Sequence, residues 1–252
     1  MNAAEFIDAL SLPESSRVDQ RVPKKTLAEH AAGKAASRRQ IQDGIEAMRW
    51  VAALKPSNCG VPAFADASRE YLEIAVLDLQ LRPTAKATQL LPLIHRAIPY
   101  PTFLVVSQEG SVSLSLAHKR WSQAEKGQVI VDGEIVVLPL DAEASDGARD
   151  LFLEAIALVK QPRATLYDLY QGWLDTALSM QAAAMLGGFR LPRGREHAAE
   201  RAEALRECER LESEMASIRA AAAREKQLPR RVELNLQLRR LADAHAAARA
   251  RL

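Results

Sequence analysis

The fold is decided by the stretch at residues 92–121, PLIHRAIPYPTFLVVSQEGSVSLSLAHKRW. It begins inside an amphipathic helix, passes a Pro-Tyr-Pro corner and continues into two apolar runs. In the second run, residues 111–117, serine alternates with valine or leucine, which is the period-two pattern of a strand. We therefore predict strands at 102–107 and 111–117, joined by a turn at Gln108-Glu109-Gly110.

The residues before this stretch predict a parallel pair of strands. Residues 71–81, YLEIAVLDLQL, are almost continuously apolar, as in a strand that is covered on both faces. Residues 84–98 have the one-sided apolar pattern of a helix, although Pro92 conflicts with a regular helix interior. A strand–helix–strand crossover within one sheet makes its two strands parallel. We expect this relation between 71–81 and 102–107.

The N-terminal part predicts a linker followed by a helix. Residues 1–36 predict a short amphipathic segment and a linker that is broken by two prolines. Residues 37–54 predict a helix, because Ser37 and Gln40 fit a capping box and apolar residues then follow the helical period. Lys55-Pro56 ends this predicted helix.

The residues after the central stretch predict a last hairpin and then helices only. Asp132-Gly133 is a strong two-residue turn signal and predicts a hairpin within residues 128–138. Residues 140–147 are polar and acidic, which indicates a boundary. Beyond it, 148–190 is helical, and two apolar-periodic stretches in 195–252 predict an antiparallel helical hairpin.

These patterns place the chain in the α/β class. We predict an N-terminal mixed-sheet α/β domain, followed by an all-α region that ends in an antiparallel, coiled-coil-like helical hairpin. The predicted parts are an N-terminal segment and linker at 1–36, an α/β domain at 37–140, a helical region at 148–190 and the helical hairpin at 195–252.

The overall charge is nearly balanced. The chain has 34 Lys and Arg against 32 Asp and Glu, a net charge of +2, so bulk attraction to nucleic acid or to an anionic membrane is not predicted. Residues 193–252 hold 14 basic and 10 acidic residues, so the C-terminal part is mildly basic. A mildly basic tail is a weak sign of a polyanion partner.

The cysteines and the hydropathy predict a cytoplasmic protein. Cys59 and Cys208 form no Cys-x-x-Cys motif, as expected for unpaired thiols in a reducing compartment. Residues 1–25 contain no long apolar run of the signal-peptide kind. No stretch approaches roughly 18 uninterrupted apolar residues, so no membrane contact is expected.

The sharpest local cluster is His118-Lys119-Arg120-Trp121. Cations beside an indole suit phosphate contact combined with base stacking. In the phase of its strand, however, His118 falls on the same side as the apolar residues of 111–117. This favours the alternative interpretation, in which His118 is a half-buried structural histidine.

A nuclease site is an alternative interpretation. Metal-dependent nucleases need converging carboxylates that hold a divalent cation, usually with a lysine nearby. The candidates for Mg²⁺ are Glu46, Glu73 and Asp78, in an order of elements that resembles the restriction-endonuclease core. The Glu/Asp-x-Lys element of that core maps to Asp78-Leu79-Gln80, where glutamine replaces the lysine. The main expectation is therefore no catalytic residue, no metal site and no cofactor.

Basic side chains are the remaining candidates for contact with nucleic acid. Most basic pairs in proteins form solvated faces, which is the alternative for each of them. The candidate nucleic-acid-binding residues are Lys24, Lys25, Lys119, Arg120, Trp121, Arg230, Arg231, Arg239 and Arg240. The arginines near residue 230 lie at one end of the predicted helical hairpin, where their charges add.

Six separated segments carry a resemblance to a known family. They are VPKK at 22–25, IEAMRWVAALKP at 45–56, IHRAIPYP at 94–101, LAHKR at 116–120, LYDLYQGW at 166–173 and EKQLPRRVELNLQL at 225–238. Together they resemble the bacterial domain of unknown function numbered 4391, over nearly the whole chain. The resemblance implies genes beside helicases and DNA methyltransferases in restriction–modification or phage-defence clusters, and it implies no catalytic residues.

The resulting expectation is a non-catalytic accessory subunit of a DNA-targeting phage-defence or restriction–modification system. Its expected partner is an operon-encoded helicase or DNA methyltransferase, with DNA and a second copy of the chain as further candidates. Two alternatives stay open, a divergent metal-dependent nuclease and a structural homodimer through the C-terminal helices.

Overall fold

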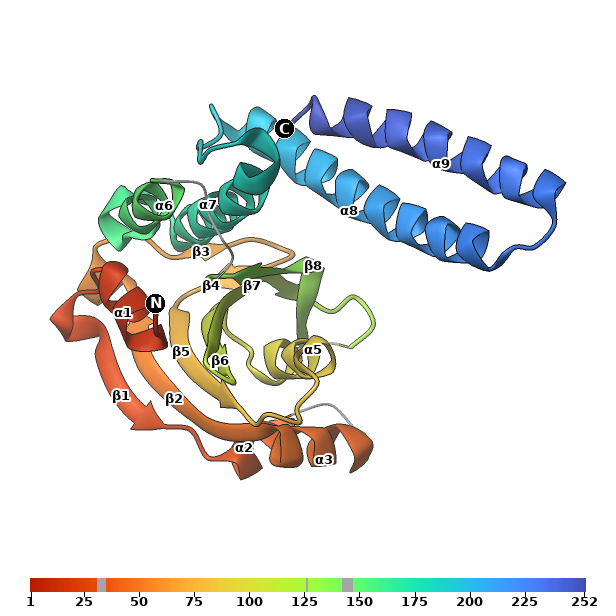
Figure 1. Cartoon of the computed structure of the whole chain (residues 1–252). Helices are drawn as coiled ribbons and strands as arrows, with labels where there is room; N and C mark the ends of the chain where they lie inside the picture. Colours follow the sequence, from red (N-terminus) through yellow and green to blue (C-terminus); the bar gives the residue numbers. More distant parts are fainter. Residues whose placement is uncertain (31–34, 126, 142–146) are drawn as a thin grey trace. The chain divides into compact units, whose positions relative to one another are not determined.

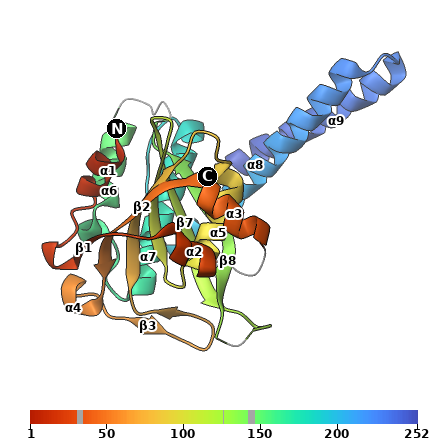
Figure 2. The same cartoon turned by 90° about the horizontal axis from the view of Figure 1, so that it is seen from below.

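The computed structural model describes residues 1–30, 35–125, 127–141 and 147–252. The chain divides into two compact units, Met1–Ala177 and Leu178–Leu252. The first unit is a sheet with helices on both faces, and the second contains two long helices that lie side by side (Figures 1 and 2). The predicted boundary at 140–147 falls mostly outside the described residues. No helix among the described residues is both long and apolar enough to cross a membrane.

The first unit is built on a mixed six-stranded sheet, as predicted. Only β5 and β6 are parallel, and every other neighbouring pair is antiparallel. In spatial order the strands are β1 (Arg17–Arg21), β2 (Ile45–Leu54), β5 (Ile74–Leu81), β6 (Thr102–Gln108), β7 (Ser111–Trp121) and β8 (Val129–Pro139). The short strands β3 (Phe64–Ala65) and β4 (Glu70–Tyr71) form a separate hairpin.

Helices cover both faces of this sheet (Figure 1). One face packs against α2 (Lys24–His30), α3 (Ala35–Gly44) and α5 (Ala87–Ala97) through a large aliphatic cluster. The other face packs against α1 (Ala3–Ala9), α6 (Ala148–Ile156) and the first part of α7 (Leu166–Leu186), with stacked or edge-on aromatic rings. The remaining short helical segments are η1 (Glu14–Ser16), α4 (Pro56–Cys59) and η2 (Leu158–Lys160).

The central stretch folds as predicted. Helix α5 connects the parallel strands β5 and β6, and it includes Pro92. The β6–β7 hairpin turns at Glu109 and Gly110, whose φ angles of 49° and 86° match the primed turns that connect twisted strands. Both faces of β7 are covered. The face that carries Ser115 packs against α5, and the opposite face, which carries His118, packs against tyrosine rings of α7. Ser115, for example, is fully buried and bonds to His95 of α5.

The prediction of a helix at 37–54 is wrong in its second half. Helix α3 ends at Gly44, and residues 45–54 form β2 instead. The pairing of β2 with β5 shifts register twice, between Ile45 and Ala47 and between Trp50 and Ala52. Each shift interrupts the alternation of buried and exposed residues, so the apolar positions imitate a helical spacing.

The linker predicted within residues 1–36 contains an edge strand. Strand β1 pairs antiparallel with β2, and its sequence RVDQR is charged and mostly exposed. Charged residues are a common protection of edge strands against pairing with other chains. Residues 17–21 therefore lack the apolar alternation of a strand, which is why they are predicted as a linker.

The hairpin predicted at 128–138 is also wrong. Residues 129–139 form one continuous strand, β8, and Asp132-Gly133 begins a bulge in it. Leu116 of β7 pairs with Val136 of β8, and His118 pairs with Asp132. The extra residues of the bulge therefore lie on β8, between Asp132 and Val136. The positive φ of Gly133, 76°, is the conformation that such a bulge requires.

The second unit contains the predicted antiparallel helical hairpin. Helices α8 (Arg195–Arg224) and α9 (Leu228–Arg249) pack together along their length (Figure 2). Their shared core contains Ala204, Leu205, Cys208, Leu211, Ala248 and Leu252. The buried guanidinium of Arg201 bonds to the carbonyls of Arg190 and Leu252 and to the Ser179 hydroxyl, which fixes the open end of the hairpin.

Candidate functional site

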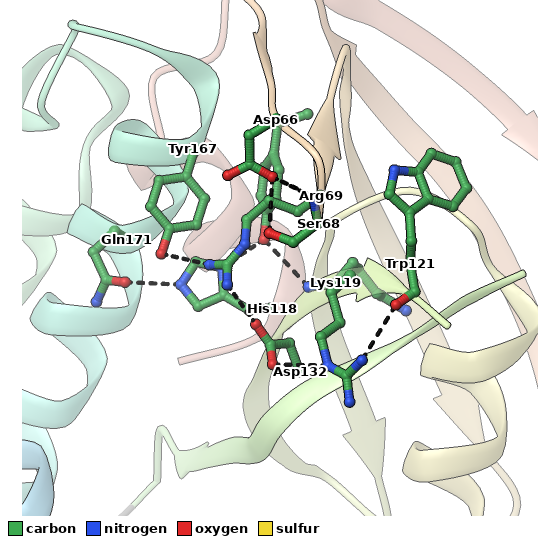
Figure 3. Close-up of polar contacts among 11 residues, drawn as sticks. Asp66, Ser68, Arg69, His118, Lys119, Trp121, Asp132, Tyr167 and Gln171 are labelled. Carbon is green, nitrogen blue, oxygen red and sulfur yellow. Dashed lines mark hydrogen bonds and ion pairs between the residues drawn. The ribbon is translucent and has the colours of Figure 1, made fainter. Parts of the chain in front are cut away.

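A polar and aromatic cluster forms where β4, β7 and β8 meet α7, and His118 lies at its centre (Figure 3). The hydroxyl of Tyr71 bonds to His118 Nδ1 and also accepts a hydrogen bond from the backbone N–H of Lys119 at 3.2 Å. On the other side, His118 Nε2 lies 2.8 Å from Gln171 Oε1. A carbonyl oxygen only accepts hydrogen bonds, so Nε2 carries the ring proton and Nδ1 accepts from Tyr71.

The surroundings of His118 favour the neutral form of its ring. The ring stacks on Tyr167 at 4.9 Å between ring centroids and meets Tyr170 edge-on at 5.4 Å. Burial lowers the pKa of His118 below its ordinary value, against the opposing effect of the hydrogen bond to Gln171. Both ring nitrogens are engaged in hydrogen bonds within the first unit. The prediction of a half-buried structural histidine is consistent with this geometry.

Two arginines share one carboxylate at the edge of the cluster, and Figure 3 labels Arg69 and Asp132 of this group. Asp132 accepts from Arg69 at 3.0 Å and from Arg120 at 3.2 Å. Arg69 also donates to the Tyr167 hydroxyl at 2.9 Å, and its guanidinium lies 5.2 Å from the centroid of that ring. Asp132 is the last residue before the β8 bulge, which sets the direction of its side chain. The group therefore joins the β3–β4 hairpin, the β7–β8 pair and α7.

A short turn positions Arg69. Oδ1 of Asp66 accepts hydrogen bonds from the backbone N–H groups of Ser68 and Arg69 and from the Ser68 hydroxyl, at 2.7 to 2.8 Å. The bonds from Ser68 lower the pKa of Asp66 below its ordinary value. The turn fixes the β3–β4 hairpin, while Ser68 accepts a bond from the backbone N–H of Trp121 at 2.7 Å.

Lys119 is buried and bonded to the end of α5, and its predicted contact with nucleic acid stays a prediction. Its side chain is 2% exposed, and its ammonium donates to the carbonyl oxygens of His95 and Ile98 at the C-terminal end of α5. These carbonyls have no partner within a helix, so the N–H groups of the Lys119 side chain satisfy them. Burial lowers the pKa of Lys119 to about 7.

We expect Lys119→Ala to lower the free energy of unfolding by about 2–3 kcal/mol, because the two buried carbonyls lose their donor. Lys25→Ala is the matched control, since Lys25 is exposed on α2, and it should change stability by less than about 0.5 kcal/mol. Urea denaturation at pH 7.5 measures both changes. Wild-type stability in Lys119→Ala would contradict the structural role.

Arg120 and Trp121 line a cavity of about 260 Å³ beside this cluster. The cavity also contains Glu70, Glu73 and Tyr100, so its polar lining has both signs of charge. Arg120 is already paired with Asp132 and bonds to the Trp121 carbonyl at 3.2 Å. The cavity therefore gives no selective attraction to an anion, and the predicted role of these two residues in nucleic-acid contact stays a prediction.

The three carboxylates of the nuclease alternative do not form a metal site. Glu46 lies on β2, not on a helix, while Glu73 precedes β5 and Asp78 lies in its middle. Glu73 pairs with Lys55 at 3.0 Å, and Asp78 faces Arg49 at 3.7 Å. Among the described residues, no group of three or more His, Cys, Asp or Glu side chains is arranged to hold a metal ion. The convergence that this alternative requires is not observed.

The other basic candidates differ in their environment. Lys24 donates to the Ile45 carbonyl at 2.6 Å and so holds the start of α2 against β2, whereas Lys25 is exposed. The four arginines at 230, 231, 239 and 240 are all exposed on α9. They lie in the second unit and take no part in the His118 cluster.

Comparison with protein families gives one match. The model of the domain of unknown function DUF4391 matches residues 10–244, nearly the whole chain. The chain belongs to the DUF4391 family. Neither the curated proteins nor the solved structures contain a significant match to it.

In this DUF4391 protein, the segments that carry the family resemblance contact one another inside the first unit. Trp50 of 45–56 meets Tyr100 of 94–101 at 6.2 Å between ring centroids. The hydroxyl of Tyr170 donates to the Thr102 carbonyl at 2.7 Å and accepts from the Ala117 N–H at 2.9 Å. With the bonds of His118 and Lys119, and with the bond from Lys24 to the Ile45 carbonyl, these contacts tie five motif segments into one network. Segment 225–238 is the exception, because it lies in the helical hairpin.

Sequence reasoning missed Arg69, Tyr71, Tyr167 and Asp132. Arg69 and Tyr71 belong to the short β3–β4 hairpin, Tyr167 to α7 and Asp132 to the bulge in β8. These elements lie far apart in the sequence. No motif spacing connects them. The only available signal was Asp132-Gly133, which was interpreted as a turn.

Proposed function

We propose that this protein is an accessory subunit, without catalytic activity of its own, of a cytoplasmic DNA-targeting phage-defence or restriction–modification system. In this proposal the α8–α9 hairpin binds a protein partner, a helicase or DNA methyltransferase encoded in the same operon. The family resemblance of the six sequence segments motivates the class of partner. An exposed apolar row on α9 supports the choice of surface.

This α9 row consists of Leu228, Val232 and Leu236, which are 62%, 50% and 54% exposed. The spacing of four residues places them on one side of the helix. The opposite side of α9 is already used, because Leu241 and Ala248 pack into the hairpin core. Three large aliphatic side chains in a row at the surface are typical of a helix that docks in a partner's apolar groove.

The state of the candidate catalytic side chains also supports an accessory role. Both nitrogens of His118 are hydrogen-bonded inside the first unit. Glu73 and Asp78 are paired with Lys55 and Arg49. These residues have structural partners, and their arrangement offers no nucleophile next to a base.

Partner binding is tested with Val232→Gln/Leu236→Gln in the full chain, co-expressed with the operon's helicase and methyltransferase. Glutamine is uncharged and at least as good a helix former as valine or leucine, but it removes the apolar contact. We expect the affinity of the captured partner to fall at least about 10-fold, as for apolar anchors at an interface centre.

Leu191→Gln is the control, because Leu191 is 49% exposed in the same unit but outside the α9 row. It should leave the affinity within about twofold. Equal losses for both variants, or no operon product bound by the wild type, would refute the proposal. A wild-type dimer that the double variant converts to a monomer would instead assign the α9 row to self-association.

A further inference from the structure

We propose that the turn end of the helical hairpin, residues 219–240, binds the phosphate backbone of duplex DNA. Charge is strongly segregated along the hairpin. The turn end holds seven basic residues against two glutamates, whereas residues 195–214 hold four arginines against seven glutamates. The seven cations are Arg219, Arg224, Lys226, Arg230, Arg231, Arg239 and Arg240.

These cations are exposed and largely without acidic partners. All seven are exposed, and Arg230 lies 3.7 Å from Glu225. Within the described ranges, no carboxylate forms an ion pair with any of the other six. The contrast within the same hairpin is Arg210, which pairs with Glu207 at 2.7 Å and with Glu214 at 3.1 Å. Cations concentrated in this way repel one another, and a polyanion relieves that repulsion.

The start of α9 adds to the positive potential at the same end. Its first turn contains Arg230 and Arg231 but no acidic residue, and no side chain caps its N-terminus. The N-terminal end of a helix already carries a partial positive charge, so these arginines add to the dipole instead of offsetting it.

The dimensions of the basic end suit a DNA backbone. From Arg230 to Arg240 the helix rises about 15 Å, a length over which one DNA strand presents about four to five phosphates. Arg219 and Arg224 contribute from the neighbouring helix α8 (Figure 1). A helix that binds an anionic membrane instead gathers its cations on one face, opposite a broad apolar face. Here they come from two helices and the turn between them.

The test is binding of the full chain to a labelled duplex of roughly 30 base pairs, from about 50 to 200 mM NaCl. The tip variant is Arg230→Gln/Arg231→Gln/Arg239→Gln/Arg240→Gln. The control is Arg38→Gln/Arg39→Gln/Arg82→Gln/Arg96→Gln, which removes the same charge from four exposed arginines of the first unit. Val232→Gln/Leu236→Gln, which alters no charge, should bind DNA as the wild type does, so this test is independent of partner binding.

We expect the tip variant to raise Kd at least about 10-fold at 100 mM salt and to reduce the salt slope by about 2, because the four arginines lie on different sides of α9 and only some of them face one duplex. The control should change Kd by only a few-fold. Thermal unfolding monitored by circular dichroism establishes that both variants are folded. The proposal is overturned if the wild type does not bind DNA at low salt, if the control loses as much affinity as the tip variant, or if phosphatidylserine vesicles bind the tip more tightly than DNA does.

Discussion

Tyr170→Phe is expected to lower the free energy of unfolding by about 2–4 kcal/mol, although only one oxygen atom is removed. The side chain is fully buried, and its hydroxyl accepts from the Ala117 N–H and shares its single proton between the Thr102 carbonyl at 2.7 Å and the Ala117 carbonyl at 3.1 Å. Burial also raises the pKa of Tyr170, so the hydroxyl stays protonated and continues to donate. Phenylalanine fits the same space but leaves these buried backbone groups without a partner, which is the more costly kind of hydrogen-bond deletion.

Urea denaturation measures this loss, with Tyr100→Phe as the matched control. Tyr100 is 40% exposed, so water replaces any contact of its hydroxyl, and the variant should stay within about 0.5 kcal/mol of the wild type. If Tyr170→Phe is as stable as Tyr100→Phe, the motif that contains Tyr170 does not hold α7 to β6 and β7.

Acid is expected to destabilise the protein through His95. This side chain is fully buried on α5, with Nε2 2.9 Å from the Ser115 hydroxyl and Nδ1 without a hydrogen-bond partner in the described structure. Burial, and secondarily the charge of Lys119, lowers the pKa of His95 from 6.5 to about 3. Below pH 6.5 the unfolded chain therefore binds a proton that the folded chain does not bind. The contribution of neutral His95 to stability is complete above pH 6.5 and falls as the pH drops toward 3, by up to about 1.4 kcal/mol per pH unit.

The measurement is the difference in unfolding free energy between wild type and His95→Gln from pH 7.5 to 4.5. Glutamine does not titrate, so the variant should lose less stability on acidification, by roughly 2 kcal/mol at pH 5, whatever its cost at neutral pH. Parallel pH profiles for wild type and His95→Gln would show that His95 does not stay neutral in the folded protein.

Much of the fold follows from sequence pattern where one physical signal dominates. Strands β6 and β7, helices α5 and α7, and the helical hairpin have regular apolar periods, and they form where predicted. The errors occur where local pattern and tertiary structure disagree. Two register shifts give β2 a helical spacing, β1 is a charged edge strand, and Asp132-Gly133 forms a bulge because β7 continues beside it.

The site was less predictable than the fold. Strand phase places His118 on the apolar side of β7, and the structure agrees. The same phase turns Lys119 toward the end of α5, but its carbonyl partners become apparent only once the helix is packed on the strand. Arg69 and Tyr167 reach the cluster from distant segments, and residue spacing in a single sequence does not indicate that the two side chains are in contact.

The central claim is that the motif residues of the first unit maintain its structure, while partner binding belongs to the α9 row. The most direct measurement is the Kd of the operon partner for wild type, Tyr170→Phe and Val232→Gln/Leu236→Gln, at a temperature where all three are folded. We predict binding within about twofold of wild type for Tyr170→Phe and at least about 10-fold weaker binding for the hairpin variant. Wild-type affinity of the hairpin variant, together with a large loss for folded Tyr170→Phe, would contradict the claim.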